Sequence, residues 1–159
     1  MMLVAAVGVL LLLTFVFSGL VQDRRNPNQQ VRSQRVDGGV EVVLEADRQG
    51  HFVAAGAING RDVTFLVDTG ATLVSVPEAL ADRIGLERMA PIGLETAAGP
   101  VQGWLTRLDE VRLGDIVHHD VRAAINPGRH DTALLGMSFL RELELNQSDG
   151  RLRIVKRNR

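Results

Sequence analysis

The residues best suited to chemistry are Asp68, Thr69 and Gly70, which lie in the run FLVDTGATLVSV over residues 65–76. This run predicts a buried strand, an abrupt polar turn and a second apolar strand. A carboxylate between apolar strands is costly, because removal from water disfavours its charged form. Gly70 lets the backbone turn tightly beneath it, and the hydroxyls of Thr69 and Thr72 can hydrogen-bond to nearby backbone. Asp, Thr and Gly also favour ordinary hairpin turns, so these residue types alone leave a simple turn open.

The context of the motif favours a catalytic loop. An apolar strand, Asp-Thr-Gly-Ala and a second β-branched strand resemble the active-site loop of retropepsin-like aspartic proteases. A second match over residues 133–140, ALLGMSFL, resembles the segment and short helix that close this loop from behind. The spacing of the two matches along the chain is that expected for one half-size domain rather than a two-lobed pepsin-like chain. The resemblance covers roughly residues 40–157 and is closest to small bacterial, membrane-tethered retropepsin-like proteases.

The resemblance assigns roles to residues in three segments. Asp68 is the expected catalytic residue, and its loop would be supported by Thr69, Gly70, Ala71 and Thr72. The loop would be backed by Leu134, Leu135 and Gly136. The hairpin over residues 92–105 corresponds to the flap that closes over substrate, where small residues let the backbone approach a peptide closely. The expected flap tip is Thr96, Ala97, Ala98 and Gly99.

The fold that the resemblance implies is all-β, a closed retropepsin-like (acid protease) barrel or sandwich with one or two short helices. It also implies a homodimer, because the chain has one Asp-Thr-Gly and the chemistry needs two carboxylates that share a proton. Asp68 of each subunit would meet at the two-fold axis, and Thr69 would hydrogen-bond across it. Thr72 stands where retroviral enzymes have an acid, so the cross-subunit salt bridge available there is missing.

The function so implied is a membrane-anchored aspartic endopeptidase, which hydrolyses peptide bonds of a protein or peptide substrate with water activated between the two Asp68 carboxylates. This chemistry requires no metal, cofactor or covalent intermediate. The alternative is a retropepsin-like module that binds peptides or mediates assembly without cleaving. Retention of Asp68, Thr69 and Gly70 favours the enzyme, because a pure binding module has no need of a costly carboxylate.

Composition limits the classes of protein to which the chain can belong. A chain of 159 residues suits one domain with a short appendage. The net charge of −1 argues against a dedicated nucleic-acid binder, which normally carries a basic excess. The absence of cysteine excludes disulfides and thiolate metal sites within the chain.

The N-terminal segment predicts a membrane anchor followed by a tether. Residues 2–21 carry no charge, and about 20 apolar residues at about 1.5 Å each span a bilayer core of about 30 Å. A cleaved signal peptide is the rival, but the start lacks Lys and Arg. Residues 22–39 are polar and predict a flexible linker. The resemblance places the domain on the periplasmic side of the bacterial inner membrane, whereas Arg24 and Arg25 by the positive-inside rule favour the cytoplasm.

Within the domain, local patterns predict the elements that position the motif. Strands are predicted over residues 40–46 and 51–58, and Asn59-Gly60 predicts a tight hairpin whose return strand, 61–67, ends at Asp68. A helix is predicted from Pro77 to its stop at Gly85. Further expectations are a hairpin over 108–125, a short helix over 137–143 and a closing strand over 151–155.

Three other groups of polar residues invite chemistry. His51 is better explained as a strand-edge residue than as a catalytic partner, because a pair of aspartates needs no histidine. His118 and His119 are adjacent in a predicted strand and point to opposite faces, which disfavours a shared metal ion. The run Asp131-Thr132-Ala133 lacks the glycine of the motif and abuts the backing segment, so we predict a loop or cap role for it.

Overall fold

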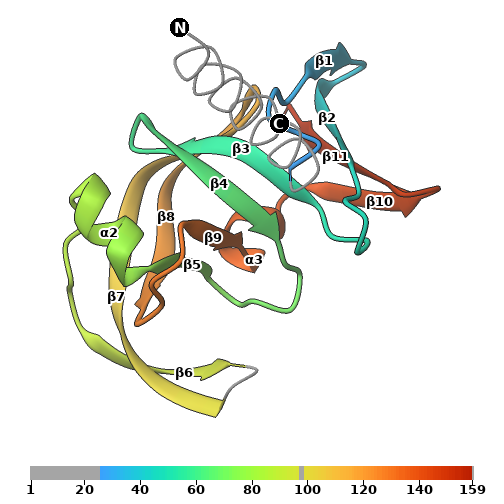
Figure 1. Ribbon diagram of the computed structural model, residues 1–159. Coiled ribbons are helices and arrows are strands. Elements are labelled where there is room, and N and C mark those ends of the chain that lie inside the picture. Colours follow the sequence, from blue (N-terminus) through green and yellow to red (C-terminus); the bar gives the residue numbers. More distant parts are fainter. Residues whose placement is uncertain (1–25, 97–98, 159) are drawn as a thin grey trace, which may run out of the picture.

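The computed structural model describes residues 26–96 and 99–158 (Figure 1). The predicted anchor, the linker residues 22–25 and the flap residues Ala97 and Ala98 lie outside these ranges. Within them, no helix is long and apolar enough to cross a membrane. The elements, in chain order, are β1 Ser33–Val36, β2 Gly39–Glu45, β3 Val53–Ile58, β4 Arg61–Val67, β5 Val74–Pro77, α2 Glu78–Ile84, β6 Pro91–Thr96, β7 Gly99–Leu113, β8 Ile116–Asn126, β9 Thr132–Leu135, α3 Met137–Leu140, β10 Glu144–Ser148 and β11 Arg151–Arg157.

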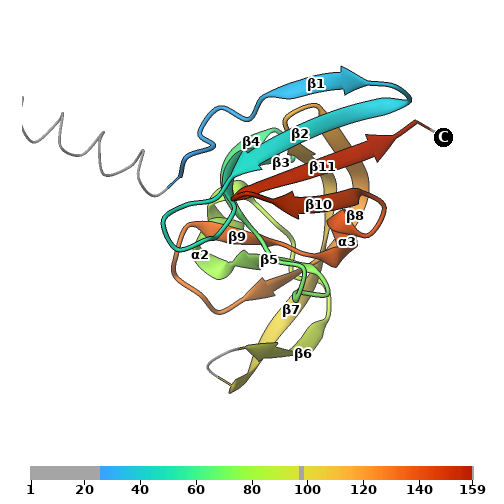
Figure 2. The same cartoon turned by 90° about the vertical axis from the view of Figure 1, so that its right-hand side faces the viewer.

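Six strands form a closed barrel in the order β3-β4-β9-β5-β8-β7, which is closed by pairing of β7 with β3. The strand pairs β4–β9 and β5–β8 are parallel, and the other pairs in the ring are antiparallel. The barrel carries two short helices, and the all-β prediction is confirmed. The β6–β7 hairpin extends beyond the barrel, away from the sheet that contains β1 (Figures 1 and 2).

A second sheet, in the order β1-β2-β11-β10, packs on the barrel. Leu152 and Ile154 of β11 are buried, as their predicted alternation requires. They join Val42 and Leu44 of β2 in the same apolar cluster as barrel residues such as Phe65. The two sheets therefore share one core, which fixes their relative position.

Two local signals in the sequence produce the turns they predict. Asn59 and Gly60 both have positive φ, 49° and 74°, and they join β3 to β4 in a two-residue hairpin loop. Gly85 ends α2 in the left-handed conformation with φ 74°. The strand that precedes Asp68 therefore has its register set by its own hairpin, with Val53 opposite Leu66.

The polar segment predicted as a flexible linker is in part a strap on the domain. Residues 26–36, which we call the N-terminal strap, include β1, and Ser33 pairs with Val42. The prediction of a flexible linker was wrong for residues 26–39. Polar composition misled it, because this segment is held mainly by backbone pairing and side-chain hydrogen bonds rather than by burial of apolar side chains. The hydroxyl of Ser33 accepts a hydrogen bond of 2.7 Å from the Asp115 N–H, and so ties the strap to the β7–β8 turn.

Asn28 is the most enclosed residue of the strap, with 6% of its surface exposed. Its side-chain amide donates to the carbonyl oxygens of Glu45 at 2.9 Å and Val53 at 2.7 Å. Its side-chain oxygen accepts from the Glu45 N–H at 2.8 Å. Its own carbonyl accepts from the Ala55 N–H at 3.0 Å. One side chain thus bridges β2 of the second sheet to β3 of the barrel.

We expect Asn28→Ala to lower the free energy of unfolding by about 3 kcal/mol, because three backbone groups lose their partner at a buried position. Urea unfolding of residues 26–159 measures the change. Gln30→Ala, at an exposed position on the same segment, is the control and should stay within about 0.5 kcal/mol of the unsubstituted protein. Equal stabilities of the two variants would show that the strap does not hold the sheets together.

Candidate active site

Strand β4 delivers Asp68 to a half-buried position at its C-terminal end. The Asp68 N–H donates to the Leu135 carbonyl at 3.2 Å, which continues the parallel pairing of β4 with β9 by one residue. Its carboxylate accepts a hydrogen bond of 2.9 Å from the Gly70 N–H. The Ala71 N–H lies 3.3 Å from the Asp68 carbonyl oxygen and closes the turn. The backbone thus fixes where this carboxylate points.

The predicted backing segment lies directly beneath this loop. A Cβ atom on Gly136 would lie 2.2 Å from the carbonyl oxygen of Leu73 and 2.7 Å from that of Ala71. The Met137 N–H donates to the Ala71 carbonyl at 2.8 Å, and the Ser138 N–H to the Thr72 carbonyl at 3.0 Å. The structure therefore brings the two sequence motifs into hydrogen-bonded contact, and only glycine fits between them.

Ser138 is a positioning residue that sequence reasoning missed. Its hydroxyl accepts a hydrogen bond of 2.8 Å from the N–H of Val74, whose side chain is fully buried. The next residue of β5 is also held by a side chain, because the Asn126 amide donates to the Ser75 hydroxyl at 2.8 Å. The serine directly follows the Gly-Met step of the backing segment, but the sequence did not reveal that it would reach a residue 64 positions away.

A pocket of about 740 Å³ reaches Leu66 and Leu134, which lie two residues before Asp68 and Gly136. Leu66 and Leu134 lie in its wall, and they pair with each other across β4 and β9. Because side chains alternate along a strand, Leu66 and Asp68 lie on the same side of β4. The remaining lining residues are Asp47, Arg48, Gln49, His51, Val53, His130 and Thr132.

His51, assigned from sequence to a strand edge, lies just before β3 with its Nδ1 3.8 Å from a carboxylate oxygen of Asp47. His130 belongs to the loop before β9. Both histidines line this pocket, together with the aliphatic side chains of Val53, Leu66 and Leu134. The alternation of Leu66 with Asp68 is the sequence signal that could have placed the pocket; the two histidines have no such local signal.

The predicted flap is a regular hairpin of β6 and β7, paired from Pro91 with Trp104 to Thr96 with Gly99. Near its tip, the Thr96 hydroxyl donates to the Gly99 carbonyl at 2.7 Å, and Gly99 has φ 109°. Such a φ strongly favours glycine. The hairpin exists as predicted, while its closure over a ligand stays a prediction.

Comparison with known proteins identifies the family. The family model described as "gag-polyprotein putative aspartyl protease" matches residues 54–142, a span that contains the Asp68 loop, the flap and the Gly136 backing. The chain belongs to this aspartyl protease family.

Two further comparisons with this aspartyl protease domain cover most of the chain. A protein named "Uncharacterized protein in cobV 5'region" from Sinorhizobium sp is 36% identical over 118 residues, which cover 70% of this chain and 49% of the relative. The chain thus spans about half the length of that relative. The crystal structure of a retropepsin-like aspartic protease from Rickettsia conorii superposes with a TM-score of 0.62 at 22% identity, over 80% of this chain and 96% of that one. The retropepsin-like fold is therefore confirmed.

A more distant similarity is to the foamy viral protease-reverse transcriptase in complex with an RNA/DNA hybrid. It has a TM-score of 0.45 and 14% identity, and covers 63% of this chain and 13% of that one.

The second Asp-Thr pair of this aspartyl protease domain lies at the far end of the strand pair that carries the loop. Thr132 pairs with Thr64, whereas Leu135 at the loop pairs with Val67. Asp131 is exposed and forms an ion pair of 2.7 Å with Arg83. It therefore stabilises the surface rather than contributing to the Asp68 site.

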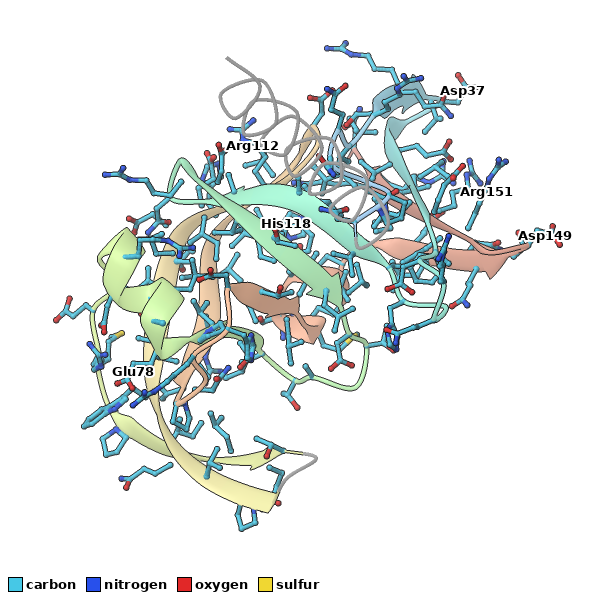
Figure 3. The ribbon with its side chains drawn as sticks, in the orientation of Figure 1. Asp37, Glu78, Arg112, His118, Asp149 and Arg151 are labelled. Carbon is cyan, nitrogen blue, oxygen red and sulfur yellow. The ribbon has the colours of Figure 1, made fainter. Side chains whose placement is uncertain are left out.

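His118 and His119 lie on opposite faces of β8, because His118 is buried and His119 exposed. The His118 ring packs on Phe139 of α3 with centroids 4.7 Å apart, in the interior of the fold (Figure 3). Burial lowers the pKa of His118, and the nearby Lys156 ammonium lowers it further. Within residues 26–96 and 99–158, no group of three or more His, Cys, Asp and Glu could hold a metal ion.

We expect Gly136→Ala to lower the free energy of unfolding by about 3 kcal/mol, because the new methyl group meets two backbone carbonyl oxygens that must move. Urea unfolding measures the loss. Gly93→Ala is the matched control, since a Cβ there meets nothing within 4 Å. A Gly136→Ala protein as stable as this control would contradict the tight fit beneath the loop.

His118 predicts a loss of stability on acidification. The unfolded chain takes up a proton at His118 below about pH 6.5, whereas the native state resists it because the pKa is lowered. Stability should therefore fall as the pH drops from about 6.5 towards the lower native pKa. Urea midpoints between pH 7.5 and 5 should fall less steeply for His118→Gln than for the unsubstituted protein or for His119→Gln, and parallel slopes would contradict the prediction.

Proposed function

We propose that the chain is an aspartic endopeptidase that hydrolyses peptide bonds as a homodimer, with one Asp68 carboxylate from each subunit. One observation carries the proposal: the half-buried Asp68 carboxylate accepts a backbone hydrogen bond from Gly70, the main chain of Asp68 bonds to Leu135 of the second motif, and the carboxylate forms no ion pair in the part of the chain that the structure describes. A carboxylate that only stabilises the fold is more often paired with a cation.

The chemistry requires a second carboxylate close to the first. Two carboxylates a few ångströms apart cannot both ionise easily, so one keeps its proton while the other takes a proton from water. The activated water attacks the peptide carbonyl, and the protonated partner hydrogen-bonds to the developing oxyanion. The sequence supplies one Asp-Thr-Gly per chain, and Asp131 lies at the wrong end of β9. A second copy of the chain is the natural source of the second carboxylate.

The surface of the loop suits such a pairing. Thr69 and Gly70 are both exposed, and among the described residues the Thr69 side chain forms no hydrogen bond. A hydroxyl at this position is available to donate across a two-fold axis to the partner's loop. The loop itself is held from below by Gly136, so association need not distort it.

The neighbouring pocket supports a protein or peptide substrate with apolar side chains near the cleaved bond. Its volume falls in the range of ligand sites, and Leu66, Leu134 and Val53 provide an aliphatic surface. The β6–β7 hairpin offers backbone groups for pairing with an extended peptide. A module that binds peptides without cleaving them would use the same surfaces, and the experiment below separates the two.

The proposed location is the bacterial inner membrane, through the apolar residues 2–21, with the protease domain in the periplasm. Confinement to a membrane surface raises the effective concentration of subunits and favours a weak dimer.

We expect residues 26–159, which retain the strap, to digest casein between pH 4 and 7.5, and Asp68→Asn to reduce the rate by at least about a thousandfold because an amide cannot act as the base. Asp131→Asn, in the motif that lacks glycine, should keep full activity. Loss of cleavage in both variants would point to a general effect on the protein. A dimer that binds casein but does not cleave it would support the binding module.

Mixing subunits tests whether two Asp68 carboxylates form one site. When the wild-type protein is unfolded and refolded with an equal amount of Asp68→Asn, random pairing leaves about one quarter of the dimers with two carboxylates. The activity per total subunit should therefore fall to about a quarter. A fall to one half would show that each subunit acts alone.

A further inference from the structure

The N-terminal strap changes how far the site can lie from the membrane. The apolar stretch ends at Val21, and the described part of the chain begins at Asn26. The chain from residue 22 to residue 26 extends at most about 18 Å. A flexible linker over residues 22–39 would extend to about 65 Å by the same measure. The strap therefore removes most of the reach that the sequence allowed.

The N-terminal end of the strap, at Asn28, lies beside the candidate substrate pocket. Asn28 donates to the carbonyl oxygen of Val53 at 2.7 Å, and Val53 lines the pocket together with Leu66 and Leu134. The Ala55 N–H bonds to the Asn28 backbone at 3.0 Å, so the contact involves main chain on both sides. The β6–β7 hairpin lies on the opposite side of the barrel from β1 (Figures 1 and 2). The contact of Asn28 with Val53 therefore places the start of the described chain beside the pocket.

Hydrogen bonds and strand pairing hold the strap on the domain at several points. Its bonds include the three made by the Asn28 side chain and the bond from Asp115 to Ser33, and β1 adds its pairing with β2. Gly114 lies against the strap so closely that a Cβ there would be 2.3 Å from the Ser33 hydroxyl. Detachment would break the three hydrogen bonds of the Asn28 side chain at once, together with the strand pairing of β1.

We infer that the strap makes this chain a protease for juxtamembrane segments, the stretches of membrane proteins that emerge directly from the bilayer. A domain of this size has a radius of gyration of about 14 Å. A compact sphere with this radius of gyration has a radius of about 18 Å, so with about 18 Å of chain the centre of the domain lies within about 36 Å of the bilayer, or roughly eleven extended substrate residues. The inference rests on the proposed membrane-anchored protease function and adds its substrate class.

The test uses full-length protein in lipid vesicles with single-span substrates. Each substrate carries a casein segment that the enzyme cuts in solution, held at a set height by a polyproline spacer. Spacers of 4, 10 and 24 prolines, at about 3.1 Å per residue, place the segment at about 12, 31 and 74 Å. We expect the segment on the longest spacer to be cleaved at least tenfold more slowly than the segment on the shortest.

Two variants assign the effect to the strap. An insertion of about 20 Gly/Ser residues between Arg25 and Asn26 should reduce the tenfold difference to less than threefold, because the domain regains its reach. The same Gly/Ser stretch appended after Arg159 should leave the difference unchanged. Both variants should cut the free casein segment at the wild-type rate.

The outcomes separate the inference from its premises. Equal rates at all three heights, or a height dependence that the insertion does not relax, would overturn the inference alone. If the full-length protein in detergent failed to cut the free segment, the proposed protease function would be wrong. If alkaline carbonate released the protein from the vesicles, residues 2–21 would not be a membrane-spanning anchor. The inference falls with either premise.

Discussion

Residues 68–73 can hold their conformation only while Gly136 lies directly beneath the carbonyl oxygens of Ala71 and Leu73. A turn this open would otherwise present unpaired backbone groups in a half-buried place, and such groups are costly. The step from β9 into α3 satisfies two of the loop's carbonyls, through the N–H groups of Met137 and Ser138. The hydroxyl of Ser138 then satisfies the next N–H, that of Val74. The loop is thus held by a segment that enters it from far away in the sequence.

This interlock explains the mixed pairing of the barrel. Strands β4 and β9 must run parallel, because Asp68 and Gly136 both follow their C-terminal ends and must meet there. Strand β5 leaves the loop in the opposite direction and pairs antiparallel with β9 at Ser75, then parallel with β8. The apolar cluster of Val74, Leu135 and Phe139 buries the junction. Stability and the orientation of the carboxylate therefore depend on the same contacts.

Local chemistry made part of the fold predictable. Asn59-Gly60 and Gly85 need positive φ, and both produced the expected turn and helix end. The strand before Asp68 followed from the Asn-Gly hairpin signal, and the flap hairpin followed from the family resemblance. The strap and Ser138 were not predictable in this way, because their hydrogen bonds join groups 17 to 82 residues apart. Hydropathy could not detect them, since a polar segment held by backbone pairing has the composition of a linker.

In the proposed membrane-anchored homodimer, symmetry would link the strap to the site. A two-fold axis relates equivalent points at equal heights along itself, so two straps can reach one membrane together only when the axis lies near the membrane normal. Two Asp68 carboxylates that meet on that axis then share one height above the bilayer, and a substrate between them runs parallel to it. A strap docked beside Val53 would limit this height to the short stretch of chain before Asn26, whereas a longer flexible tether would let each subunit tilt independently. Anchoring through a strap therefore restrains both the orientation in which two half-sites meet and the height at which a peptide is held.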